Sequence, residues 1–173
     1  MSLPRVIGIL AISALSLTVA IADATAQGKK INKQQLVGTW KLVATENIGP
    51  DGSKLDIFGQ SPKGILVFDR SGNYSLTIVR SDLPKFAAST ADKGTAEESK
   101  AVVSGMIAHF GTYSLDEADR TLTTRIEGSS FPNLAGGEQK RIISSLTKDE
   151  LKYTNPTAAV GGTKAEVVWR RAK

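Results

Sequence analysis

The sequence predicts an all-β fold: an eight-stranded antiparallel up-and-down barrel with one short helix between the third and fourth strands. Three observations lead to this prediction. Polar and apolar residues alternate along most of the chain, as they do in strands that bury one face. Eight such segments follow one another with connections of hairpin length, whereas a sandwich needs longer crossovers. Short Trp-containing segments near both ends of the series can form the seam where the first and last strands pair.

Residues 1–26 are expected to be a signal peptide. Residues 1–5 carry a positive charge and residues 6–22 are apolar or small, and Ala24-Thr25-Ala26 then fits a small-x-small cleavage site before Gln27. The apolar run is near the lower limit of what spans a bilayer, so an uncleaved anchor is the alternative. We expect an exported protein, periplasmic or secreted, with no integral membrane segment after cleavage.

The mature chain would comprise an N-terminal segment, 27–35, and one barrel domain, 36–173. The sequence has no cysteine and therefore no disulfide framework, which in an exported protein is more typical of a bacterial envelope than of animal secretion. The net charge is +5, and the basic residues are scattered without interleaved aromatics. This distribution argues against nucleic-acid binding and modestly favours an anionic ligand. The oligomeric state is left open.

The first strand is predicted over residues 36–45, where Gly38 and Trp40 share the apolar face. Residues 47–54, rich in Gly, Pro and Asp, are predicted to form a loop. Two strands follow, over 63–68 and 73–80, joined by a turn with a late glycine.

The chain then changes character. Thr95 and Glu98 have the spacing of a capping box, which starts a helix by pairing two free amides with side-chain acceptors. The helix is expected to end near Gly105, and it could cover the barrel as a lid or pack on its side. The apolar residues assigned to it are Ala101, Val102 and Ile107.

Alternation returns in five further segments, which complete the eight strands: 109–115, 120–127, 138–146, 151–153 and 164–171. On the last of them Trp169 and Arg171 have the same parity, so we expect Arg171 rather than Arg170 to stack on Trp40. Such a cation–π contact contributes about 0.5–2 kcal/mol. Gly38, without a Cβ, would allow the close approach. The alternative is a core tryptophan and two unrelated surface arginines.

These segments resemble the bacterial and fungal lipocalin-like domain family over about residues 36–171. The resemblance is carried, in order, by Leu36-Val37-Gly38-Thr39-Trp40-Lys41-Leu42, Asp51-Gly52, Phe58-Gly59, Pro62-x-Gly64, Gly72-x-Tyr74-Ser75, Phe110-Gly111-Thr112-Tyr113-Ser114, Phe131-Pro132-Asn133, Glu138-Gln139-x-Arg141 and Trp169-Arg170-Arg171. It implies a cup-shaped calycin-type barrel with Gly-x-Trp at the closed end and a ligand space at the open end.

The chain departs from the family at two places. Many relatives carry a His-His pair where this chain has Thr124-Arg125, and a Trp where it has Leu134. Histidine chemistry suggested for those relatives therefore does not transfer to these positions.

Candidate ligand-binding residues are polar or aromatic groups on strand faces that also carry apolar residues, or in a loop at the barrel mouth. They are Tyr74, Arg80, His109, Tyr113, Phe131 and Arg141. Burying an unpaired arginine is costly, so Arg80 and Arg141 should meet Glu127, Glu138 or an anionic ligand. Rim ion pairs are the alternative, and the side on which Arg125 lies is open.

His109 could act as a general base only with a carboxylate or an oriented substrate beside it. The alternative is a structural histidine bonded to backbone or to a tyrosine. One histidine and no cysteine cannot make a closed zinc site, and no metal or other cofactor is expected. Phe131, together with Phe58 and Phe86, could form an apolar lip or merely anchor loops.

Together these features favour an exported protein that binds a small, mainly apolar molecule in its barrel, with an anionic group on that molecule as the option that the arginines leave open. One alternative is a small-barrel isomerase, cyclase or lyase with Tyr, Arg and His109 as acid–base groups, which is an analogy between folds. A second is an envelope protein with a filled barrel that acts through its surface. An open, polar-lined cavity separates the first two from the third, and a carboxylate on His109 would favour the enzyme.

Overall fold

The structure, a computed structural model, describes residues 30–158 and 160–173. The expected signal peptide and its cleavage site lie outside the described residues. No helix in the described part is both long and apolar enough to cross a membrane.

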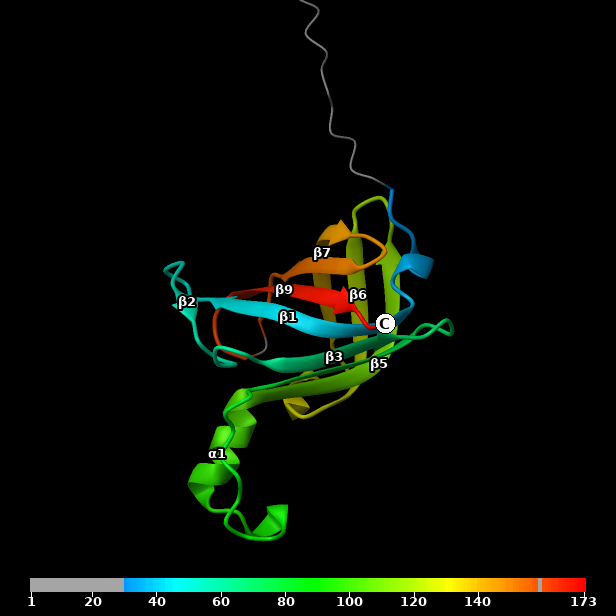
Figure 1. The fold of residues 1–173 in the computed structure, drawn as a ribbon. Coiled ribbons are helices and arrows are strands. Elements are labelled where there is room, and N and C mark those ends of the chain that lie inside the picture. The colour runs from blue at the N-terminus through cyan, green and yellow to red at the C-terminus, as the bar shows by residue number, and fades with distance from the viewer. Residues whose placement is uncertain (1–29, 159) are drawn as a thin grey trace, which may run out of the picture.

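Eight antiparallel strands form a closed up-and-down barrel, which confirms the predicted fold (Figure 1). Each strand pairs with the next, and the last pairs with the first. The strands are β1 (Gly38–Ile48), β3 (Lys63–Phe68), β4 (Asn73–Val79), β5 (Met106–Asp116), β6 (Thr121–Ser129), β7 (Glu138–Leu146), β8 (Glu150–Asn155) and β9 (Lys164–Arg171). The two-residue strand β2 (Lys54–Leu55) pairs only with the end of β1.

Asn47 and Ile107 were assigned from the sequence to the wrong elements. Asn47, expected in a loop, lies on β1, because its side-chain amide donates to the carbonyls of Val160 (2.6 Å) and Gly161 (3.0 Å) far along the chain. Ile107, assigned to the helix, lies on β5 and pairs with Ile78 of β4. In both cases a partner distant in sequence overrides the local signal.

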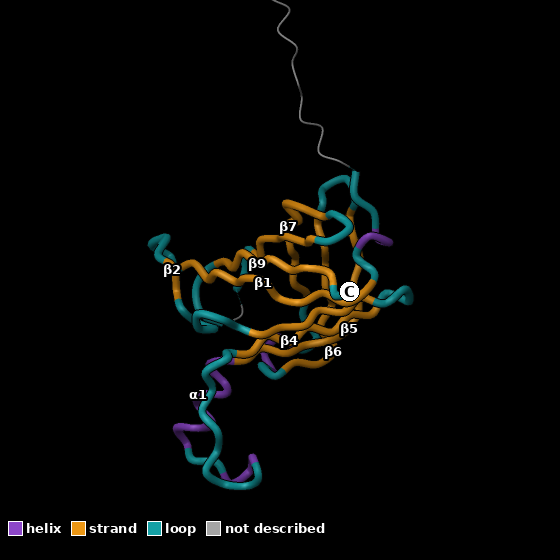
Figure 2. Tube along the Cα trace, in the orientation of Figure 1, coloured by secondary structure: helices purple, strands orange, loops and turns teal. Residues whose placement is uncertain are grey.

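The helix α1 (Ala96–Gly105) lies between β4 and β5, the third and fourth strands of the barrel. Its capping box is formed: Thr95 Oγ1 accepts from the Glu98 amide at 3.2 Å, and the Glu98 carboxylate accepts from the Thr95 amide at 2.8 Å. Figures 1 and 2 show that α1 and the loop before it extend away from the strands. Three short 3-10 helices complete the described elements: η1 (Lys33–Gln35), η2 (Ala91–Lys93) and η3 (Pro132–Leu134).

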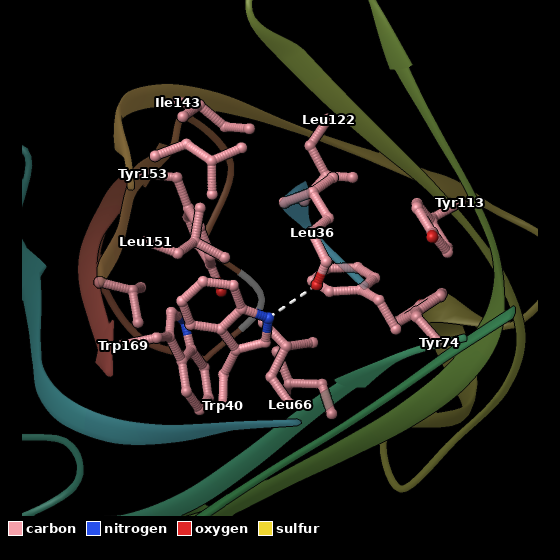
Figure 3. Packing of buried hydrophobic residues seen from close by; sticks show 14 of the residues in the cluster. Leu36, Trp40, Leu66, Tyr74, Tyr113, Leu122, Ile143, Leu151, Tyr153 and Trp169 are labelled. Carbon is pink, nitrogen blue, oxygen red and sulfur yellow. Dashed lines mark hydrogen bonds between the residues drawn. The ribbon is translucent and has the colours of Figure 1, made fainter. Parts of the chain in front are cut away.

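An apolar cluster runs through the barrel and fills it around the two seam tryptophans (Figure 3). Trp40 and Trp169 from the two seam strands are fully buried in it, together with Leu36. The Trp40 indole N–H donates to the carbonyl oxygen of Leu36 at 2.8 Å, so its one polar group is satisfied despite burial. The filled part around the tryptophans is the closed end of the barrel.

Arg171 caps this end from outside. Its Cζ lies 4.0 Å from the centroid of the Trp40 ring, and its guanidinium donates to the carbonyls of Val37 (2.7 Å), Gln35 (2.6 Å) and Lys148 (2.6 Å). The stack expected from strand parity is therefore present, whereas Arg170 is exposed.

Gly38 makes room for this guanidinium. A Cβ on Gly38 would lie 2.7 Å from Arg171 Nη1, and the φ of +128° at Gly38 is one that other residues rarely adopt. The glycine of the Gly-x-Trp motif therefore fits this backbone conformation and leaves space for the arginine from the other end of the chain.

We expect Trp40→Ala to lower the free energy of unfolding by about 3–5 kcal/mol, because a fully buried indole is replaced by a cavity. Denaturant unfolding measures this loss. Val43→Ala on the same strand is the control: Val43 is 48% exposed, so its loss should stay within about 0.5 kcal/mol. A loss below about 1 kcal/mol for Trp40→Ala would show that Trp40 is not a core residue.

Candidate ligand-binding site

The barrel contains a partly open cavity of about 60 Å³. Inward-facing side chains of β4, β5 and β9 and two loops provide its apolar wall, which includes Phe58, Leu76, Ile78, Ile107, Val160 and Val167. Its polar residues include Asn47, His109, Gln139, Arg141, Tyr153 and Asn155. Because α1 contributes none of the lining residues, the helix is not a lid over this cavity. The space suits a small ligand, or the small end of a larger one.

Arg141 is the charged residue of the cavity wall and is only 3% exposed. It lies on β7, two residues from Gln139, so both side chains point into the barrel. Arg141 Nη2 donates to Gln139 Oε1 at 2.9 Å, and Nη1 donates to Thr124 Oγ1 on β6. The Cζ of Arg141 lies 5.6 Å from the centroid of the Tyr153 ring. All of these partners are neutral.

His109 connects Arg141 to Tyr74. Arg141 Nη2 lies 3.5 Å from His109 Nε2, and Tyr74 Oη lies 2.8 Å from His109 Nδ1. A guanidinium can only donate, so this geometry fits the tautomer in which Nε2 is the acceptor and Nδ1–H donates to the Tyr74 oxygen. The structural alternative considered for His109, a bond to a neighbouring tyrosine, matches this arrangement.

Both ring systems are held uncharged. Burial, and secondarily the charge of Arg141, lower the pKa of His109 to about 3, since both effects disfavour a second positive charge. Burial also raises the pKa of the Tyr74 hydroxyl. At neutral pH the cluster of Arg141, His109 and Tyr74 therefore carries one positive charge.

Among residues 30–158 and 160–173, no carboxylate forms an ion pair with Arg141, and Glu127 acts on the cluster only through its charge at Tyr74. The ion pairs formed there join other residues. Glu138, a partner considered for the inward arginines, instead pairs with Arg125 at 2.8 Å on the outer wall, which settles the side on which Arg125 lies. Glu127, the other candidate, is exposed.

Arg80 does not share the cavity. It follows the end of β4 and forms a two-bond pair with Asp82 (2.8 and 3.0 Å). It also donates to the carbonyls of Asp56 (3.2 Å) and Ile57 (2.9 Å). Parity placed Arg80 on the face of Ile78, but the strand ends at Val79, so the side chain lies at the rim and holds a loop.

Tyr113 does point inward, but it lies toward the closed end of the barrel. Its hydroxyl donates to the Asp69 carbonyl at 2.8 Å, its ring centroid lies 4.7 Å from that of Phe68, and Lys33 Nζ lies over it. Tyr113 lies four positions beyond His109 along β5, about 13 Å of strand. The expected single cavity therefore contains His109 and Arg141, with Tyr74 directly behind His109, but neither Arg80 nor Tyr113.

The three phenylalanines expected at the mouth separate as well. Phe58 lines the cavity and is buried. Phe86 lies in the loop before α1, against Gly94, and Phe131 precedes η3 in the β6–β7 connection and is exposed. Neither Phe86 nor Phe131 is part of the cavity wall.

Sequence reasoning missed three residues that complete the cluster: Thr124, Gln139 and Tyr153. Each is a polar residue at an inward position of an otherwise apolar strand face. That is the signal that could have identified them. In the part of the chain that the structure describes, no group of three or more His, Cys, Asp or Glu residues is arranged to hold a metal ion.

Comparison with known proteins identifies one family. The lipocalin-like domain profile matches residues 37–172. A crystal structure of a lipocalin-like protein from Bacteroides uniformis is similar with a TM-score of 0.45 and 14% identity, over 80% of this chain and 99% of that chain. A mutant of the fluorescent protein UnaG is similar with a TM-score of 0.36 and 16% identity, over 80% and 97%. Curated protein sequences give no significant match.

We expect His109, the one histidine of the sequence, to stay neutral between pH 8 and pH 5. In an NMR titration its ring-proton shifts should remain constant over that range and change only near pH 3. A midpoint between pH 6 and 7 would contradict the buried, Arg141-facing position.

The same pKa shift has a consequence for stability. The unfolded chain binds a proton at His109 below about pH 6.5, whereas the folded chain does not until about pH 3. Stability should therefore fall as the pH is lowered through this window. His109→Gln should remove that part of the pH dependence.

Proposed function

The chain belongs to the lipocalin-like domain family, and on that premise we propose that it is an exported protein that binds a small, mainly apolar molecule inside its barrel. Arg141 would be available to an anionic group on that molecule.

The observation that carries this proposal is the cavity itself. Apolar side chains form most of its wall, and a few polar groups gather around Arg141. This combination is typical of small-molecule sites, in which apolar contact supplies affinity and a few polar groups fix orientation. The open interior supports binding over the alternative of a filled barrel that acts through its surface.

The contacts of His109 support binding over acid–base catalysis. The enzyme alternative required a carboxylate on His109, and within the described ranges its side-chain partners are Tyr74 and Arg141. With its pKa lowered to about 3, His109 is a weak base at neutral pH, far from the value that suits a general base there.

Export rests on the sequence of residues 1–26, with its charged start, apolar run and small-x-small site. We expect N-terminal sequencing of the exported protein to begin at Gln27. Protein that retains Met1 or Ser2 at its N-terminus would contradict cleavage.

Ligand binding is tested by native mass spectrometry of protein purified from its own host, which should show a bound small molecule. Ala165→Phe should remove it, because Ala165 lines the cavity and a phenyl ring would occupy the space. Ala44→Phe adds the same ring at an exposed position of β1 and should leave binding unchanged. If the Ala165→Phe protein folds and still carries the molecule, the barrel is not its site.

A further inference from the structure

We infer that the cavity selects a ligand with one negative charge, a monocarboxylate with a short apolar body, over both its neutral analogue and a dianion. The inference rests on the proposed function and specifies the ligand class for the same site.

The positive charge of Arg141 has no ion-pair partner among the described residues. A guanidinium is charged at any physiological pH, and this one is almost fully buried. A buried charge is costly unless it is paired, and none of the ion pairs among the described residues includes Arg141. A ligand anion would supply the missing partner in the same cavity.

Arg141 and its neighbours have hydrogen-bond donors to offer a ligand. A guanidinium has five N–H groups, and the described contacts with Thr124, Gln139 and His109 use three of them. Two N–H groups remain, and the Gln139 amide and the Tyr153 hydroxyl line the same space. A carboxylate is a pure acceptor and can use all of these donors.

His109 limits the charge of the site, and this limit determines which anions the site selects. The titratable groups in contact with His109 are Tyr74 from β4 and Arg141 from β7, with Tyr153 from β8 beyond Arg141. Glu127 of β6 acts on Tyr74 through its charge, but it is exposed on the outer face and is not part of the cavity wall. The lone pair of His109 Nε2 faces Arg141 and the Nδ1 edge faces Tyr74, so the imidazole orients the guanidinium without adding a second cation. The remaining polar wall residues are neutral amides and hydroxyls. The site therefore offers one positive charge.

A site with one positive charge disfavours both a neutral ligand and a dianion. A monoanion neutralises the buried site. A neutral analogue leaves Arg141 unpaired, and a dianion leaves one negative charge buried without a partner. The rest of the wall is apolar and the cavity measures about 60 Å³, which fits a short hydrocarbon body behind the carboxylate.

The test is an NMR titration of the 27–173 protein at pH 7 with matched probes. Butanoate and octanoate are compared with butanamide and octanamide, and with butanedioate and octanedioate. We expect each monocarboxylate to bind at least tenfold more tightly than its amide and its dicarboxylate. Amides that bind as well as the acids would overturn the charge inference and leave the proposed apolar binding intact. Dicarboxylates that bind as well as the monocarboxylates would overturn the single-charge limit. If no probe binds, the monocarboxylate inference fails, whereas the proposed function is decided separately by native mass spectrometry of the protein from its own host.

Variants locate the effect. Arg141→Met should reduce octanoate affinity at least tenfold, to the level of octanamide. Arg125→Met, a surface arginine on the neighbouring strand, should leave it unchanged. An Arg141→Met protein with native-like spectra and undiminished octanoate affinity would overturn the assignment to Arg141. If that variant does not fold, the comparison of probes on the unmodified protein still decides the inference.

Discussion

The pairing of the last strand with the first, with Arg171 stacked on Trp40 at one end of that seam, turns a curled sheet into an enclosed space. Closure removes the open edges that a sheet would otherwise expose. It also creates a buried interior, in which the environment of a charged group is set by the surrounding side chains. Gly38 and Trp40 on β1 and Arg171 on β9 supply the parts of this contact, and none of them forms it alone.

Three arginines in this molecule illustrate how environment decides role. Arg171 is satisfied by three backbone carbonyls and an indole face, and it serves the fold. Arg80 is satisfied by a carboxylate and two carbonyls, and it holds a loop at the rim. Arg141 is buried among neutral acceptors beside a cavity. A ligand can change the balance of charge most at Arg141, because the charges of the first two are already well accommodated.

The cluster of Arg141, His109 and Tyr74 at the cavity wall owes its charge state to burial. In water an imidazole and a phenol beside an arginine would be free to exchange partners with solvent. In the barrel, His109 is fixed between Tyr74 and Arg141 and its pKa is lowered to about 3. A neutral imidazole in this place positions the guanidinium and limits the site to one positive charge, which ties the packing of the barrel to the kind of ligand it can hold.

The sequence by itself determined the inward face along most of each strand, because side chains alternate with a period of two. This sufficed for the eight strands, for Arg171 rather than Arg170 on Trp40, and for the inward direction of His109 and Arg141. Alternation failed where the register shifts, as between Leu42 and Ala44 on β1, which leaves Ala44 exposed. Only the tertiary structure decided how far along the barrel axis a side chain lies and which groups it contacts. Alternation alone does not predict that Arg80 lies beyond the end of β4 or that Tyr113 lies at the closed end. A residue's position along the barrel depends on strand length and register. Alternation also does not predict which of Phe58, Phe86 and Phe131 reaches the cavity, since loops take their positions from contacts between residues distant in the chain.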